Sequence, residues 1–189
     1  MLNLPTHQQI CRQFAGLLSY PAEEQLPTLD SLSETLQPIA AEATERLRNF
    51  AAFREQQAPS RVEEIYTSCF DLQPSCHPYV GYQLCGESQA RILFLMQLKQ
   101  LYREYGFTDE SELPDHLVTM LRFLGSIDDQ ACRDEIIADG LRPALEKLVA
   151  GFDGEEQPYL DLLQALRSFL NLPLATEGSA AGPEKECDS

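Results

Sequence analysis

Four side chains of zinc-binding type lie in the middle of the chain, where metal binding or thiol chemistry has to be considered. They are Cys69, Cys76, His77 and Cys85. Structural zinc sites usually contain two cysteines separated by two residues, and these four include no such pair. A reactive thiol needs an aligned base and positive surroundings, which an acidic chain does not obviously supply. The pattern favours packing in a loop and core, so we assign no catalytic residue, no metal and no cofactor.

A second candidate is the segment ELPDH, residues 112–116. Pro114 suits the first turn of a helix and predicts that Asp115 and His116 occupy its exposed first turn. An acidic group is electrostatically favourable at a helix start. Glu112 and His116 are four residues apart and can pair across the helix entry, which would explain both without a function. Local physics alone favours that structural explanation.

Helices are expected to position these residues. Leucine dominates the apolar set, and valine, which suits strands, occurs only four times. Apolar spacings of three and four, with Pro and Gly at the ends, predict helices over residues 6–20, 39–50, 60–70, 87–105, 114–125, 128–152 and 158–170.

Three of these predictions are specific enough to test. Residues 87–105 are apolar nearly all round, which predicts the central, most buried helix, ending at Gly106. Gly140 and Pro143 predict a bend or a split in the helix over 128–152. Residues 71–85, with two prolines and no helical period, are expected to form a structured loop.

Length and composition predict an all-α fold, a single compact multi-helix domain with a central buried helix. Residues 1–172 would form this domain, and residues 173–189 a disordered acidic tail. The chain shows neither a secretory signal nor a membrane-spanning stretch, so we expect a cytoplasmic protein without membrane insertion.

The formal charge is −16, from 14 basic and 30 acidic residues. This charge repels nucleic-acid phosphates and anionic lipids, and a basic partner would be complementary. An acidic surface that only maintains solubility explains the composition equally well.

Three segments in sequence order carry a resemblance to a known family: YTSCFD at 66–71, GESQAR at 86–91 and ELPDHL at 112–117. Together they resemble the TorD/DmsD/NarJ family of redox-enzyme maturation chaperones. The likeness is strongest over residues 60–125 and continues more weakly to the last helix. The family's signature is Glu-Pro-x-Asp-His, whereas here the proline follows a leucine, which is more similar to the NarJ-like branch.

The resemblance implies an all-helical cytoplasmic chaperone, not an enzyme. Its partner would be the N-terminal leader, twin-arginine or leader-like, of a molybdenum-containing catalytic subunit. It would assist molybdenum cofactor insertion and assembly before export or membrane attachment. The NarJ-like branch implies clients among the nitrate reductases and related enzymes.

An acidic rim and an apolar floor suit such a leader, which joins a basic motif to an apolar stretch. Glu112 and Asp115 would attract the basic part, and His116 would bond peptide backbone or shape the groove. Four aromatic residues would line the apolar part, although two of them, Tyr66 and Phe70, equally suit an ordinary core. Glu87 and Arg91, four residues apart, would first pair with each other. The residues assigned to peptide binding are Tyr66, Phe70, Tyr79, Tyr82, Glu87, Arg91, Glu112, Pro114, Asp115 and His116.

Two other functions remain open from the sequence. One is a small Cys/His metal-binding protein built on the four residues of zinc-binding type. The other is a helical scaffold that binds assembled subunits without recognising a leader, as a monomer or as a homodimer that exchanges helices across residues 71–85.

Overall fold

The computed structural model describes residues 2–21, 26–72, 76–152 and 157–173, and these residues contain helices and no β-strand. The all-α prediction is confirmed. The elements are α1 (Leu4–Leu17), α2 (Leu26–Leu36), α3 (Ala41–Gln56), α4 (Pro59–Phe70), α5 (Val80–Cys85), α6 (Gln89–Glu104), α7 (Leu117–Leu124), α8 (Gln130–Glu135), the π-helix η3 (Ile136–Leu141), α9 (Arg142–Ala150) and α10 (Pro158–Leu170).

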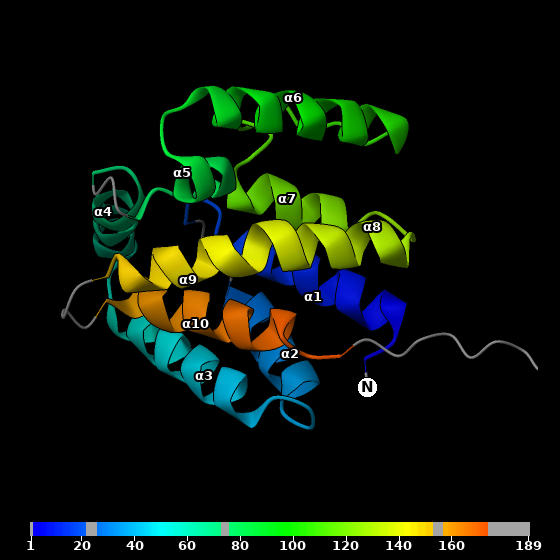
Figure 1. Cartoon of the computed structure of the whole chain (residues 1–189). Coiled ribbons are helices and arrows are strands. Elements are labelled where there is room, and N and C mark those ends of the chain that lie inside the picture. The colour runs from blue at the N-terminus through cyan, green and yellow to red at the C-terminus, as the bar shows by residue number, and fades with distance from the viewer. Residues whose placement is uncertain (1, 22–25, 73–75, 153–156, 174–189) are drawn as a thin grey trace, which may run out of the picture.

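Helix α10 lies at the centre of the packing, between α3 and α9 (Figure 1). Pro158 opens it as predicted, because a missing N–H costs nothing in a first turn. Its side chains Tyr159, Leu162, Leu166 and Phe169 are fully buried. Helix α7 packs on α1, and α1 packs on α2. The rings of Phe14 in α1 and Phe169 in α10 lie with centroids 5.7 Å apart, so the core contains residues from both ends of the chain.

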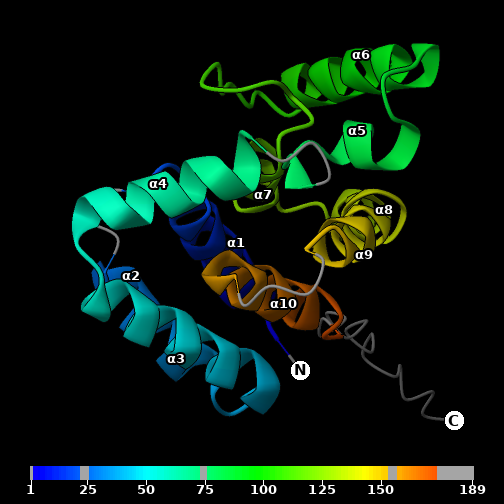
Figure 2. The same ribbon diagram turned by 90° about the vertical axis from the view of Figure 1, so that its left-hand side faces the viewer.

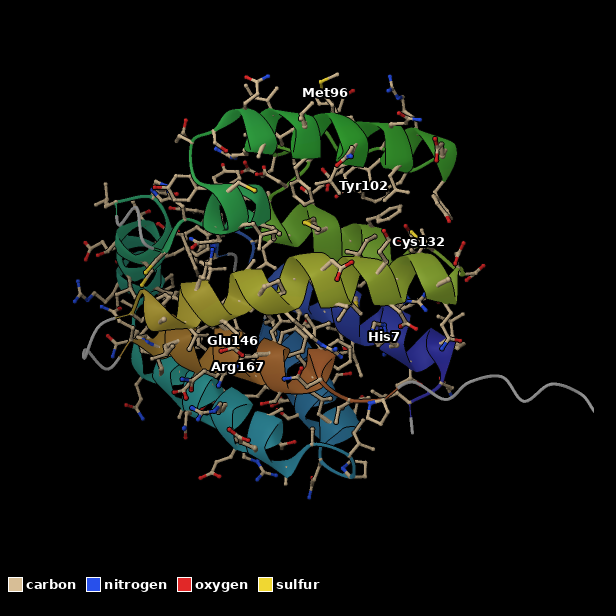
Figure 3. All side chains as sticks on the ribbon, viewed as in Figure 1. His7, Met96, Tyr102, Cys132, Glu146 and Arg167 are labelled. Carbon is tan, nitrogen blue, oxygen red and sulfur yellow. The ribbon has the colours of Figure 1, made fainter. Side chains whose placement is uncertain are left out.

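Helix α6 is not the central helix that its all-round apolar sequence predicts. It lies at the outer edge of the molecule in both views (Figures 1 and 2). Ile92, Leu93 and Met96 are 51%, 54% and 62% exposed, and Met96 points away from the other helices (Figure 3). The apolar pattern was misleading because it cannot show how many sides of a helix have neighbours. The predicted end is confirmed, since Gly106 follows the helix with φ of 65°.

The stretch expected to bend or split is interrupted where Gly140 lies, because the π-helix η3 separates α8 from α9. The three helices follow one another without an intervening loop (Figure 1). The Arg142 N–H bonds the Ile137 carbonyl five residues back, which defines the π-turn. Pro143 lacks the N–H that a regular helix needs at this position, and it lies directly after the π-helix, in the first turn of α9.

Several local predictions were wrong. Helix α2 lies between the predicted helices 6–20 and 39–50, where no helix was expected, and α5 lies inside the predicted loop. Two helix starts also differ from the predicted residues 6 and 128: Asn3 caps α1, which begins at Leu4, and Asp129 caps α8, which begins at Gln130. A cap depends on where the first hydrogen-bonded turn closes, and a shift of one residue changes it.

No helix in the described part of the chain combines the length and apolarity needed to cross a membrane. The predicted acidic tail falls outside the described residues, apart from Pro173.

Candidate functional site

A cavity of about 280 Å³ opens beside the ELPDH segment, and we call it the ELPDH cavity. Four of the ten residues assigned from the sequence line it: Tyr66, Tyr79, Glu112 and His116. The other lining residues are Ser19, Tyr20, Asp71, Pro78, Ser111, Val118 and Arg122.

Backbone hydrogen bonds fix the segment before α5 against the ELPDH segment. The Val80 N–H donates to the Asp115 carbonyl at 2.7 Å, and the Leu117 N–H donates to the Pro78 carbonyl at 2.7 Å. This short bridge places the Tyr79 ring edge-on to the His116 ring, with centroids 5.1 Å apart. The Tyr79 hydroxyl donates to Glu112 at 3.2 Å. Two chain segments therefore form one wall of the cavity.

His116 is the N-cap of α7, not a residue of an exposed first turn. Its Nδ1 accepts a hydrogen bond from the Val118 N–H at 3.2 Å, and the residue is only 6% exposed. The helix begins at Leu117 because the backbone of His116 is extended. Burial lowers the pKa of His116 to about 4, so the imidazole is neutral near pH 7. Since Nδ1 is an acceptor, the ring proton is on Nε2.

Asp115 is fully buried, which also contradicts the predicted exposed turn. Its Oδ2 accepts from Arg91 Nε at 2.9 Å, and its Oδ1 has no hydrogen-bond partner among the described residues. Arg91 pairs with Glu87 at 3.2 Å as predicted, and its guanidinium lies 5.4 Å and 5.7 Å from the ring centres of Tyr79 and Tyr82. Through Arg91, this network connects α6 to Asp115 and Tyr79 in the wall of the cavity.

Two assigned residues belong to the packing. Phe70 is 3% exposed and contacts Tyr159, with ring centroids 5.2 Å apart. Pro114 is buried, and its carbonyl accepts from the Tyr102 hydroxyl at 2.7 Å. Tyr66 has both roles, because it lines the cavity while its hydroxyl donates to the Leu18 carbonyl at 3.1 Å.

The sequence did not single out Tyr20, Asp71 and Arg122 as site residues. Tyr20 had served only to mark a helix end, and Asp71 closes the YTSCFD segment. Arg122 pairs with Asp109 at 2.8 Å. By contrast, neither Asp71 nor Glu112 forms an ion pair within the part of the chain that the structure describes. The cavity therefore carries an excess of negative charge beside aromatic rings.

The cysteines and His77 do not converge on a metal site in the described ranges, where no group of three or more His, Cys, Asp or Glu could hold an ion. Cys69 and Cys76 are buried, whereas Cys85 is exposed. Burial raises the pKa of the Cys69 thiol to about 12, which keeps it protonated.

Comparisons with known proteins show which family the chain belongs to. The family model described as nitrate reductase delta subunit matches residues 33–174. A relative from Bacillus subtilis (strain 168), assigned as the nitrate reductase molybdenum cofactor assembly chaperone NarJ, is 30% identical over 171 residues, which cover 89% of this chain and 92% of that protein. A crystal structure from Archaeoglobus fulgidus, of a protein assigned to redox enzyme maturation, shares the fold with a TM-score of 0.58 and 24% identity, covering 86% of this chain and 93% of that one. The chain therefore belongs to the nitrate reductase delta subunit family, within the TorD/NarJ group that its three motifs resemble.

Proposed function

We propose that the protein is an assembly chaperone that binds the N-terminal leader of a molybdenum-containing nitrate reductase or a related catalytic subunit. It acts in the cytoplasm, before export or membrane attachment, and has no turnover of its own. Family membership and the name of the Bacillus relative support this role. The observation that carries the binding site is the ELPDH cavity, which has carboxylates and tyrosines at the motif.

The cavity offers different chemistry to the two parts of a leader. Glu112 and Asp71 provide negative charge for its basic residues. Tyr66 and Tyr79 provide ring faces for apolar or cationic groups. A leader bound there would be shielded from other proteins while the cofactor enters the client. This role requires no cofactor site on the chaperone.

Asp115 has an indirect role in this proposal. A fully buried carboxylate cannot contact a client directly, but it holds Arg91, and Arg91 lies over Tyr79 in the cavity wall. Asp115 is therefore a positioning residue, as are Glu87 and Tyr82, which also contact Arg91.

Calorimetric titration with a synthetic peptide of the client's N-terminus tests the proposal. We expect saturable binding that is weakened by Glu112→Gln, because this change removes a charge from the rim. Glu146→Gln is the matched control, since Glu146 pairs with Arg167 on the distant α9–α10 face (Figure 3). A client that binds equally well after deletion of its leader would instead support a scaffold for assembled subunits.

A further inference from the structure

Helix α6 has an apolar face that no other helix covers. Three of the seven exposed large apolar side chains among the described residues lie on it, namely Ile92, Leu93 and Met96. They are one, three and four residues apart, so they form one patch on the helix surface. The opposite side packs inward through the buried residues Leu98 and Tyr102, whereas Met96 points away from the molecule (Figure 3). A contiguous exposed apolar patch is typical of an interaction surface.

The same helix lacks the negative charge of the chain as a whole. Residues 88–103 contain no Asp or Glu, although the chain has 30 in 189 residues. Lys99 and Arg103 are exposed, and neither forms an ion pair with a residue that the structure describes. A second molecule with the same charge of −16 can therefore approach α6 with little local repulsion.

The patch is complementary to itself when two copies of α6 pack antiparallel around a twofold axis. If the axis passes between residues 94 and 95, Leu93 lies opposite Met96 of the second copy, and the symmetry repeats this contact. Each apolar patch then covers the other, and the long stems of exposed polar side chains extend the contact on both sides.

This register also brings opposite charges together at both ends of the contact. Arg103 reaches the level of Glu87 of the second copy, because each residue lies about eight positions from the axis. The side chain of Glu87 is 81% exposed, so it remains accessible while it also pairs with Arg91. A membrane offers no such match, and two cations are few to hold a molecule of charge −16 on anionic lipids.

We propose that two copies of the protein associate through the outer faces of α6 as a symmetric antiparallel pair. No helix is exchanged between them. None of the residues that line the ELPDH cavity belongs to α6, so each copy keeps its own cavity. A contact of one helix with one helix is smaller than the interfaces of stable dimers. The dimer therefore exchanges rapidly with the monomer, with a dissociation constant on the order of 10–100 µM.

Sedimentation of the full-length protein over a concentration series around this range tests the dimer. The average mass should rise from that of a monomer toward that of a dimer. Met96→Glu should weaken association by at least about tenfold, because it places two carboxylates against apolar side chains in each dimer. Leu72→Glu is the matched control, since Leu72 is 71% exposed but lies outside α6. Urea unfolding of dilute Met96→Glu should match that of the unmodified protein, which shows that the variant is folded.

Reversal of the charges tests the antiparallel register. Arg103→Glu should weaken the dimer several-fold. The double variant with Arg103→Glu and Glu87→Arg should associate more tightly than Arg103→Glu alone, because the reversed charges pair again across the axis. A double variant that associates no better than Arg103→Glu would overturn this register.

A protein that stays monomeric at every concentration overturns the proposal, and so does a dimer that Met96→Glu leaves intact. Flotation with phosphatidylglycerol vesicles examines the alternative surface. A monomer that binds these vesicles, and loses this binding in Met96→Glu, assigns the α6 face to a membrane instead.

Calorimetry with the leader peptide separates this proposal from the chaperone function. Met96→Glu should bind the leader with the affinity of the unmodified protein, since Met96 does not line the ELPDH cavity. A monomer that still binds the leader refutes the dimer and leaves the chaperone function standing. A dimer that binds no leader refutes the chaperone function alone.

Discussion

Arg91 binds two carboxylates that differ in their access to water. Asp115 has a side-chain exposure of 0%, whereas that of Glu87 is 81%. Removing one partner of a buried pair leaves an uncompensated charge, and exposed pairs contribute little. We expect Asp115→Ala to lower the free energy of unfolding by roughly 3–5 kcal/mol and Glu87→Ala by less than about 1 kcal/mol. Urea unfolding measures both, and similar losses would show that Arg91 is not held by Asp115.

His116 should make the stability depend on pH. Burial lowers the pKa of the folded residue to about 4 from its ordinary value of 6.5. Between these values the unfolded chain binds a proton that the folded chain does not. The stabilisation from the neutral ring is therefore complete above about pH 6.5 and is lost as the pH falls toward 4.

The variant His116→Asn isolates this contribution, which is at most roughly 3 kcal/mol. Asn can cap α7 but does not titrate, and buried His7 contributes equally to both proteins. We expect the advantage of the unmodified protein over the variant to shrink between pH 7 and pH 4.5 in urea unfolding. An advantage that does not change with pH would contradict a buried, neutral His116.

At the scale of elements, Gly81 sets how closely α5 approaches the Arg91–Asp115 pair. A Cβ atom at this position would lie 2.7 Å from Asp115 Oδ2 and 2.8 Å from Phe94 Cδ1. The helices would have to separate, so we expect Gly81→Ala to lower the free energy of unfolding by roughly 1–3 kcal/mol.

Gly16 provides the matched control within α1, because a Cβ there meets nothing within 4 Å. Gly16→Ala should raise the free energy of unfolding by about 0.5–1 kcal/mol, since alanine has the better helix propensity. Equal effects of the two substitutions would mean that α5 and α6 are not tightly joined at Gly81.

At the scale of the whole molecule, the charge of −16 gives salt two opposing effects. Screening weakens the attraction of a basic leader to the cavity, and it also relieves repulsion within the folded chaperone. Raising the salt concentration should therefore reduce the affinity for the leader peptide without reducing the free energy of unfolding. Calorimetry and urea unfolding in the same buffers check this. An affinity that does not change with salt would exclude attraction of the leader by the acidic residues of the cavity.

The sequence alone determined the helical class, the start of α10 at Pro158 and the end of α6 before Gly106. It also identified four residues of the ELPDH cavity: the motif segments contain Tyr66, Glu112 and His116, and Tyr79 was assigned as an aromatic residue of the groove. These features depend on local periodicity, on backbone restrictions of Pro and Gly, and on short motifs. None of them requires knowledge of which helices are neighbours.

Only the tertiary structure decided that α6 lies at the edge, that Asp115 is buried against Arg91, and that Tyr20 and Asp71 join Glu112 around one cavity. These residues come from separate parts of the chain. The burial of a residue, and the meeting of distant residues at one cavity, depend on long-range packing. The sequence around an apolar or acidic residue is the same whether the side chain is covered by another helix or exposed to water.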